Sequence, residues 1–161
     1  THSTTATGFG RLGGGSYNVC SMQPTGPFCW GRSDDGITTD PEGIEAAIIS
    51  GGSGHLCLVT PNGTLACWGA ETFGRLDFEA TDLVALEAGY RHTCAIHTGG
   101  ALSCWGVDDG SGYDHGQVSD APGAGNFTVV GSGDFHSCAV VQADNTIVCW
   151  GSDEQGQSTP L

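Results

Sequence analysis

Short apolar segments separated by turn-forming residues recur along the chain. Leu56-Cys57-Leu58-Val59 and Leu65-Ala66-Cys67-Trp68 are two such segments. Their brevity and their bounding turn residues are typical of β-strands rather than helices. Between them stands Thr60-Pro61-Asn62-Gly63-Thr64, whose Asn-Gly pair tolerates the positive φ that tight hairpin turns demand. The pattern therefore predicts an antiparallel hairpin here.

One unit of this kind occurs four times. Each copy contains Cys-Trp-Gly, carries a second cysteine 9 to 11 positions earlier, and has a glycine five positions before that second cysteine. An apolar stretch opens each copy, and the copies are offset by 37, 37 and 44 residues. We therefore divide the chain into an extension, residues 1–8, and a single domain of four repeats, residues 9–45, 46–82, 83–126 and 127–161.

Each repeat predicts three strands: the apolar opening, a strand through the second cysteine, and the Cys-Trp-Gly strand. A fourth strand is expected after Gly-Gln, as at Gly116-Gln117-Val118 and Gly156-Gln157-Ser158. Short strands in units of this length favour propeller blades or a related array. The fold class we expect is all-β, a propeller-like array of four short-stranded repeats, each with a disulfide-closed hairpin.

The eight cysteines fall in pairs across the predicted hairpins. The midpoint of each pair lies in a turn-like segment, so the two cysteines stand opposite each other, with Cβ atoms about 4.5–5.5 Å apart. A disulfide closes such a gap with little movement. Each bridge would close a loop of roughly ten residues and contribute about 2–3 kcal/mol. The repeated geometry favours four local bridges: Cys20–Cys29, Cys57–Cys67, Cys94–Cys104 and Cys138–Cys149.

Tryptophan and histidine also recur at fixed places in the repeat. Adjacent strand residues face opposite ways, so each tryptophan points away from its neighbouring cysteine, and we expect it to be wedged against the next unit. These tryptophans are Trp30, Trp68, Trp105 and Trp150. The residues two positions before the second cysteine are Asn18, His55, His92 and His136. We predict that the tryptophans and histidines pack between repeats. The alternatives are a zinc site that joins histidine to reduced cysteines, and a tryptophan surface that stacks on sugars.

The fourth unit carries a family resemblance through Phe127-Thr128-Val129-Val130, the segment from Gly133 to Val140, Val148-Cys149-Trp150-Gly151 and Gly156-Gln157. It resembles the repeat of the regulator of chromosome condensation family, in the bacterial exported form with paired cysteines. The third unit matches nearly as well, and the first is weakest because Asn18 replaces the histidine.

The resemblance implies a β-propeller, usually of seven blades, that serves as a recognition scaffold. Relatives act in nucleotide exchange on a small GTPase, in chromatin docking, or as a secreted inhibitor of β-lactamases. This chain departs from the pattern because it has four copies. The copies could close as a small propeller, two chains could share one propeller, or the units could stack as an open array.

Charge narrows the classes of partner. The chain has 18 acidic and 4 basic side chains, no lysine, and a formal net charge of −14. Such a chain repels a phosphate backbone and an anionic membrane surface, so we expect no nucleic-acid binding. No apolar run approaches the roughly 18 residues of a membrane span, so we expect no membrane insertion. The 28 glycines and the low aliphatic content are typical of disorder, but the repeat explains them through turns and covalent bridges.

Acidic loops follow the Cys-Trp-Gly strands. Asp108, Asp109 and Asp114 are the best candidates for calcium, which prefers clustered carboxylate and carbonyl oxygens, although the usual alternating ligand pattern is missing. Solvated turns are the alternative, and no other cofactor is expected. Asn62 and Asn126 begin N-glycosylation sequons, which matter if the source glycosylates exported proteins. No motif of catalytic residues is present, so we expect no enzyme.

These features favour a secreted, extracellular or cell-surface binding module, because disulfides persist in oxidising environments. In one hypothesis a closed monomer presents its loops to a protein or glycan partner, as an inhibitor or a glycan-binding propeller would. In the other, the chains are structural and self-associate into a fibre or surface layer by strand exchange at the termini. Residues 1–8 would then be a closing or donated strand.

Overall fold

The computed structural model describes residues 11–23, 25–39 and 43–160. Within these residues, strands form four separate three-stranded antiparallel sheets. Sheet 1 contains β1 (Leu12–Gly14), β2 (Asn18–Gln23) and β3 (Gly26–Gly31). Sheet 2 contains β4 (Ile48–Gly51), β5 (His55–Val59) and β6 (Leu65–Gly69). The expected all-β fold class is confirmed.

The other two sheets follow the same order. Sheet 3 contains β7 (Leu83–Ala88), β8 (His92–His97) and β9 (Leu102–Gly106). Sheet 4 contains β10 (Phe127–Ser132), β11 (His136–Val141) and β12 (Ile147–Gly151). A single turn of 3-10 helix, η1 (Thr72–Gly74), lies in the segment between sheets 2 and 3. No helix of the described residues is long and apolar enough to span a membrane.

The hairpin register places the two cysteines of every repeat directly opposite each other. Cys57 pairs with Cys67, for example, and Cys94 with Cys104. The four predicted disulfides are confirmed, with Cα–Cα distances of 4.0 to 4.1 Å and no free cysteine in the chain. Since no thiolate is left, the zinc interpretation of the histidines fails.

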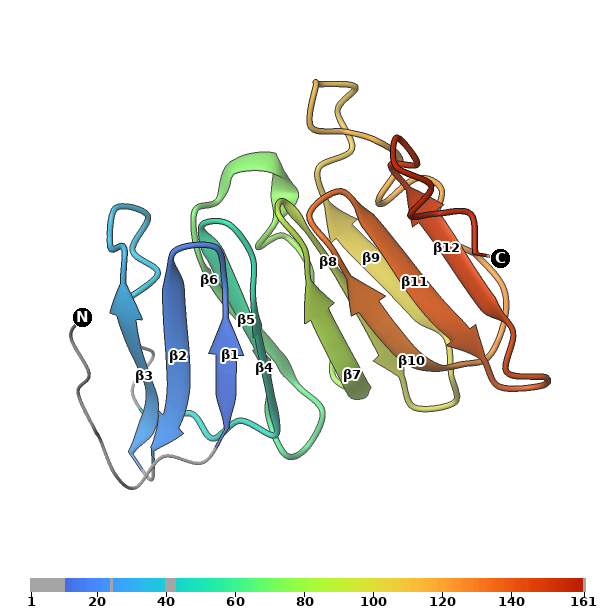
Figure 1. The fold of residues 1–161 in the computed structure, drawn as a ribbon. Coiled ribbons are helices and arrows are strands. Elements are labelled where there is room, and N and C mark those ends of the chain that lie inside the picture. Colours follow the sequence, from blue (N-terminus) through green and yellow to red (C-terminus); the bar gives the residue numbers. More distant parts are fainter. Residues whose placement is uncertain (1–10, 24, 40–42, 161) are drawn as a thin grey trace, which may run out of the picture.

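The sheets stand side by side in a curved row, in chain order (Figure 1). Their first strands form the inner edge of the row, where β1 contacts β4, β4 contacts β7, and β7 contacts β10. Sheets 1 and 4 lie at opposite ends of the row (Figure 1). Each sheet therefore has the place of one blade in a propeller.

Three apolar clusters fill the spaces between neighbouring sheets. In each cluster the face of one sheet that carries its disulfide meets the face of the following sheet that carries its tryptophan. Between sheets 2 and 3, for instance, Cys57 and Val59 meet Leu86, Ala95 and Trp105. The other two clusters repeat this arrangement between sheets 1 and 2 and between sheets 3 and 4. The disulfides of sheets 1 to 3 thus form part of the inter-sheet cores.

The predicted fourth strand is wrong in the repeats where it was placed. Residues 116–118 and 156–158 lie in turns, and Gly116 has a φ of +81°. The Gln117 side chain accepts a hydrogen bond from the His115 N–H and donates one to the Tyr113 carbonyl. These bonds close the segment on itself, so its backbone is not extended for pairing. The strand-donation hypothesis rests on residues 1–8, which lie outside the described part of the chain.

Candidate functional site

The recurring glycine and histidine join neighbouring sheets at the turn between the first and second strand of each sheet. A Cβ added to Gly89 would lie 2.2 Å from His92 Cε1 and 2.4 Å from the Gly133 carbonyl oxygen of the following repeat. Only glycine lets the histidine ring and the next sheet approach this closely. Gly52 stands in the same relation to His55 and to Gly89. The motif is therefore a joint between repeats.

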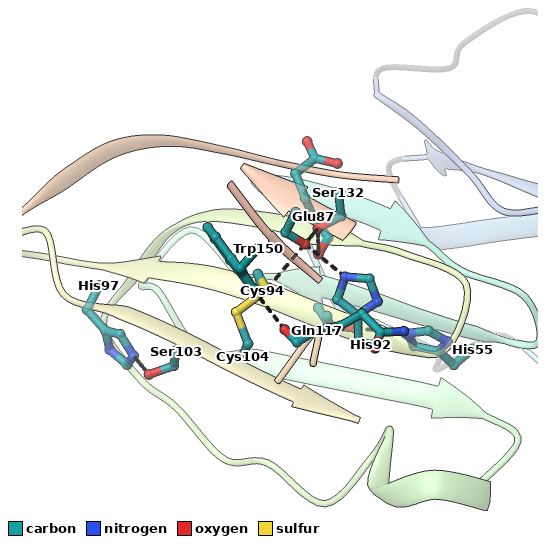
Figure 2. The surroundings of a disulfide bond; sticks show 12 residues. His55, Glu87, His92, Cys94, His97, Ser103, Cys104, Gln117, Ser132 and Trp150 are labelled. Atoms are coloured by element: carbon teal, nitrogen blue, oxygen red, sulfur yellow. Dashed lines mark hydrogen bonds between the residues drawn. A yellow bond between two sulfur atoms is a disulfide. The ribbon is translucent and has the colours of Figure 1, made fainter. Parts of the chain in front are cut away.

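The histidine ring reaches across each of two joints to a hydroxyl group. His55 Nε2 lies 2.9 Å from Thr93 Oγ1, and His92 Nε2 lies 2.8 Å from Ser137 Oγ. Figure 2 shows the rings of His55 and His92. Burial, reinforced by the Arg75 charge, lowers the pKa of His55 to about 3. Burial also lowers the pKa of His92 to about 4, with a smaller contribution from His136. Both rings are neutral at physiological pH.

Each tryptophan of sheets 2 to 4 is bonded to the segment that follows the preceding sheet. The indole N–H of Trp105 donates to the Arg75 carbonyl at 3.0 Å. That of Trp150 donates to the Gln117 carbonyl at 2.9 Å (Figure 2). Trp68 bonds the Ile37 carbonyl in the same way. The tryptophans therefore pack against the preceding unit, and our expectation that they pack against the next unit is wrong. The reason is that the disulfide face of each sheet meets the following unit, so the tryptophan face meets the preceding one.

A hollow of about 280 Å³ opens where the three joints between the four repeats converge. Its wall is mostly backbone, since glycines recur at each joint, and it collects residues from all four repeats. The lining includes Gly15, Gly52, Gly89, Tyr90, Gly133 and Asp134. The hollow is the axial cavity that four neighbouring blades would border in a propeller.

An arginine surrounded by aromatic rings lies beside this hollow. The Arg91 guanidinium carbon is 3.5 Å from the centre of the Tyr113 ring, 4.3 Å from that of Phe73 and 5.4 Å from that of Tyr90. Tyr90 continues the group to Phe135, at 5.4 Å between ring centres. We name this group, together with His115 beside Phe135, the Arg91 cluster.

The Arg91 cluster is assembled from segments that are distant in the sequence. Tyr90 and Arg91 lie in the turn between β7 and β8, and Phe135 lies in the matching turn between β10 and β11. Phe73 belongs to η1, and Tyr113 lies in the segment between β9 and β10. Sequence reasoning missed this site because its members do not recur in all four repeats. An aromatic residue within two positions before Asn18, His92 and His136 was the available signal.

The backbone of Phe73 is strained where it contributes to the cluster. Its φ of +66° lies in the left-handed region, which costs a non-glycine residue of order 1–3 kcal/mol. The same residue places its ring 4.3 Å from Arg91. Such outliers persist where the surroundings hold them, and they gather at functional sites.

The aspartates proposed for calcium organise a turn next to the cluster. Asp114 accepts hydrogen bonds from the Gly110 and Gly116 N–H groups, and these bonds lower its pKa. Bonds from Ser111 similarly lower the pKa of Asp109, while Asp108 is exposed. Within the described ranges, no three His, Cys, Asp or Glu side chains lie together in a way that would hold a metal ion. Calcium binding here stays a prediction.

The glycosylation candidates both lie on the surface. Asn62 is exposed at the turn between β5 and β6, and Asn126 is exposed directly before β10.

The candidate tryptophan Trp30, by contrast with Trp105 and Trp150, is 44% exposed, on the outer face of sheet 1. His136 is half-buried on sheet 4.

These features define a β-propeller built of disulfide-bonded blades. Residues 127–157 match the family model of the regulator of chromosome condensation (RCC1) repeat, which confirms the resemblance of the fourth unit. No curated protein matches the sequence.

Solved structures show the same fold. The CRINKLY WD40 ectodomain of the Arabidopsis thaliana receptor kinase ACR4 matches 89% of this chain and 50% of its own length, with 24% identity and a TM-score of 0.72. The ectodomain of the Physcomitrella patens receptor kinase CR4 matches 87% of this chain and 40% of its own length, with 25% identity and a TM-score of 0.68.

Prp20p from Saccharomyces cerevisiae matches 92% of this chain and 46% of its own length, with 16% identity and a TM-score of 0.70. The chain thus spans half or less of the length of these three proteins.

Proposed function

We propose that the chain is a non-enzymatic, extracellular protein-binding module and that the Arg91 cluster is its binding surface. The observation that carries this proposal is the contact between Arg91 and Tyr113, at 3.5 Å from guanidinium carbon to ring centre, with Tyr113 40% exposed. Arginine and tyrosine are the residue types that dominate binding energy at protein interfaces. Their combination on an accessible loop favours recognition of a protein.

The cluster is also ordered in advance. Arg91 lies near the rings of Phe73, Tyr90 and Tyr113, which limit its rotamers. The turns that carry Tyr90 and Phe135 are joined by a backbone hydrogen bond from the Tyr90 N–H to the Asp134 carbonyl. A surface that is rigid before binding loses less conformational entropy on association.

The charge of the chain favours a partner segment rich in lysine or arginine. The formal net charge is −14. Exposed carboxylates lie in the segments that carry the cluster, at Asp134 next to Phe135 and at Asp108 and Asp109 in the segment that carries Tyr113. Two more, Asp153 and Glu154, lie in the corresponding segment after β12. Complementary charge accelerates association and excludes partners of the same sign.

Two further observations support the location and the kind of partner. Four disulfides are typical of proteins from oxidising compartments, and two of the similar structures are receptor ectodomains. The Prp20p study concerns its binding to Gsp1p and histones, so another propeller of this fold has protein partners.

Selection from a random peptide library displayed on phage tests the proposal. We expect peptides selected on the native chain to be enriched in lysine and arginine and to lose at least about tenfold in affinity toward Y113A. Tyr17→Ala is the matched control, because Tyr17 is 63% exposed and lies 5.7 Å from the Arg32 guanidinium carbon, outside the cluster. Equal binding to native, Y113A and Y17A chains would refute the assigned surface.

A further inference from the structure

Two of the four arginines of the chain converge on one aromatic ring. The Arg91 guanidinium carbon lies 4.3 Å from the centre of the Phe73 ring, and that of Arg75 lies 5.8 Å from the same centre. Arg75 is 3% exposed, and Arg91 is half-buried. Like charges that approach each other away from water repel more strongly than they do in solvent. The fold thus concentrates positive charge at one point of a chain whose net charge is −14.

The two guanidinium groups interact electrostatically, and nearby carboxylates offset only part of their charge. Burial lowers the pKa of Arg75, and the charge of Arg91 lowers it further. The negative charge of Asp35 acts in the opposite direction. Arg91 in turn contributes to the lowered pKa of Asp109, after the hydrogen bonds from Ser111. In the part of the chain that the structure describes, neither carboxylate forms an ion pair with these arginines.

The two arginines differ in their hydrogen bonds. Arg75 donates to the Thr72 and Ser53 carbonyl oxygens, at 2.8 Å each, so the backbone holds its guanidinium in place. The Arg91 guanidinium donates no hydrogen bond to any described residue, and its neighbours are aromatic rings. The face of an aromatic ring attracts the charge but offers no lone-pair acceptor to the N–H groups. Arg91 therefore keeps donors for a ligand.

We propose that Arg91 binds a carboxylate group of the protein partner and that the charge of the buried Arg75 adds to the attraction, an inference that rests on the function proposed above for the Arg91 cluster. The edge of a guanidinium matches a carboxylate in a planar, bidentate geometry. Contact with the Tyr113 ring, at 3.5 Å, limits the orientations of that edge. A phosphate carries nearly two negative charges, so this acidic chain repels it more strongly than a carboxylate.

The carboxylate refines the chemistry of the partner segment. Lysine and arginine side chains of the segment would face the exposed carboxylates of Asp109 and Asp134, while its carboxylate would face Arg91. A segment with the opposite order of charges would bring like charges together, so the arrangement also gives specificity. The carboxylate belongs either to an aspartate or glutamate side chain or to the C-terminus of the partner, and the experiment distinguishes these two sources.

Changes in the peptide test the proposal on the native chain. Peptides are selected from two phage libraries, one that leaves the C-terminus of each peptide free and one that does not, and those that bind Y113A more weakly are kept. Each peptide is then synthesised with asparagine and glutamine in place of its acidic residues, with an amidated C-terminus, and with both changes. Titration calorimetry should show a loss of at least about tenfold in affinity from the first change if a side chain supplies the carboxylate, or from the second if the C-terminus does.

The outcomes separate this inference from the proposed function. Unchanged affinity in all three forms would overturn the carboxylate contact and leave the proposed function in place, because the dependence on Tyr113 would remain. A selection that gives no Tyr113-dependent peptide would overturn both.

Variants of the protein locate the contact. R91M removes the guanidinium, so the original peptide and its neutral form should bind R91M equally. R32M is the matched control, because Arg32 also lies near a ring, 5.7 Å from that of Tyr17, but is already paired with Asp34 at 2.7 Å. R32M should keep the full preference for the original peptide. The same preference in R91M would overturn the contact with Arg91.

Circular dichroism and free-thiol counts identify a variant that has failed to fold. R91K then replaces R91M, and the preference should fall at least about threefold because an ammonium group does not bind both carboxylate oxygens in one plane. An unchanged preference in folded R91K would likewise overturn the contact.

Discussion

The Nε2 atom of His92 lies 2.8 Å from the Ser137 hydroxyl, 45 residues away in the sequence. This bond joins sheet 3 to sheet 4 inside a buried contact, so neither group has access to water. It also places Ser137 within 2.9 Å of Ser132 Oγ on β10. The joint between these repeats is therefore specific as well as apolar.

Replacing Ser137 with alanine should destabilise the fold. The change leaves a buried His92 nitrogen without its partner, which costs about 1–3 kcal/mol. The measurement is the urea midpoint at neutral pH. Ser103→Ala is the control, because Ser103 bonds His97 in a less buried position, at 2.9 Å. Equal midpoints for S137A and the native chain would show that the bond contributes nothing.

Acidification should destabilise the protein through its buried histidines. The folded pKa values of His55 and His92, about 3 and about 4, lie below the ordinary value of 6.5. Between these limits the unfolded chain binds protons that the folded chain excludes. The stability that depends on the neutral histidines is therefore fully present above about pH 6.5. Below that pH the free energy of unfolding falls toward pH 4, by about 1.4 kcal/mol per pH unit for each histidine.

Urea unfolding at a series of pH values measures this loss. The slope of the unfolding free energy against pH is proportional to the number of protons taken up on unfolding. In H92Q this number should be smaller by about one over the same pH interval. The carboxylates Asp109 and Asp114, whose pKa values are lowered, act in the same direction but at lower pH. An identical slope in H92Q and the native chain would mean that His92 is protonated in the folded state.

Adding a methyl group at Gly89 should disrupt the joint between sheets 3 and 4. The new Cβ would lie 2.2 Å from His92 Cε1 and 2.4 Å from the Gly133 carbonyl oxygen, so backbone must move. Overpacking of this kind costs about 1–3 kcal/mol or more. Gly112→Ala is the control, since nothing lies within 4 Å of its added Cβ. Thermal unfolding should separate the two variants, and matching melting temperatures would contradict the close approach.

Removing one disulfide should weaken the whole row of sheets. The Cys94–Cys104 bridge spans 10 residues, and its replacement in C94S/C104S should cost about 2–3 kcal/mol in loop entropy. The two sulfurs also pack in the core between sheets 3 and 4, which adds to the cost. Denaturant unfolding measures the loss. Thiol titration of the denatured, unreduced native chain should find no free thiol, and eight thiols would contradict the pairing.

Much of the fold was predictable because its determinants are local and repeated. Cys57 and Cys67 lie on either side of a short turn, and this spacing alone sets them opposite each other in a hairpin. Alternation along a strand likewise sets Trp68 on the face away from the disulfide. Four copies of the same pattern removed the ambiguity that a single short strand carries.

Other features depended on how one sheet sits against the next. The prediction of a fourth strand was wrong because the Gln117 side chain forms hydrogen bonds within its own segment. Strand periodicity does not reveal such bonds. The tryptophans pack on the preceding unit because the disulfide faces meet the following one.

The sequence by itself determined the repeat, the hairpins, the disulfide pairing and the acidic surface. Tertiary structure alone decided that Phe73, Arg91, Tyr113 and Phe135 form one cluster. The physical reason is the range of the interactions. A hairpin is specified by neighbouring residues and a regular period, whereas the cluster joins non-repeated loops whose distances follow from the stacking of whole sheets.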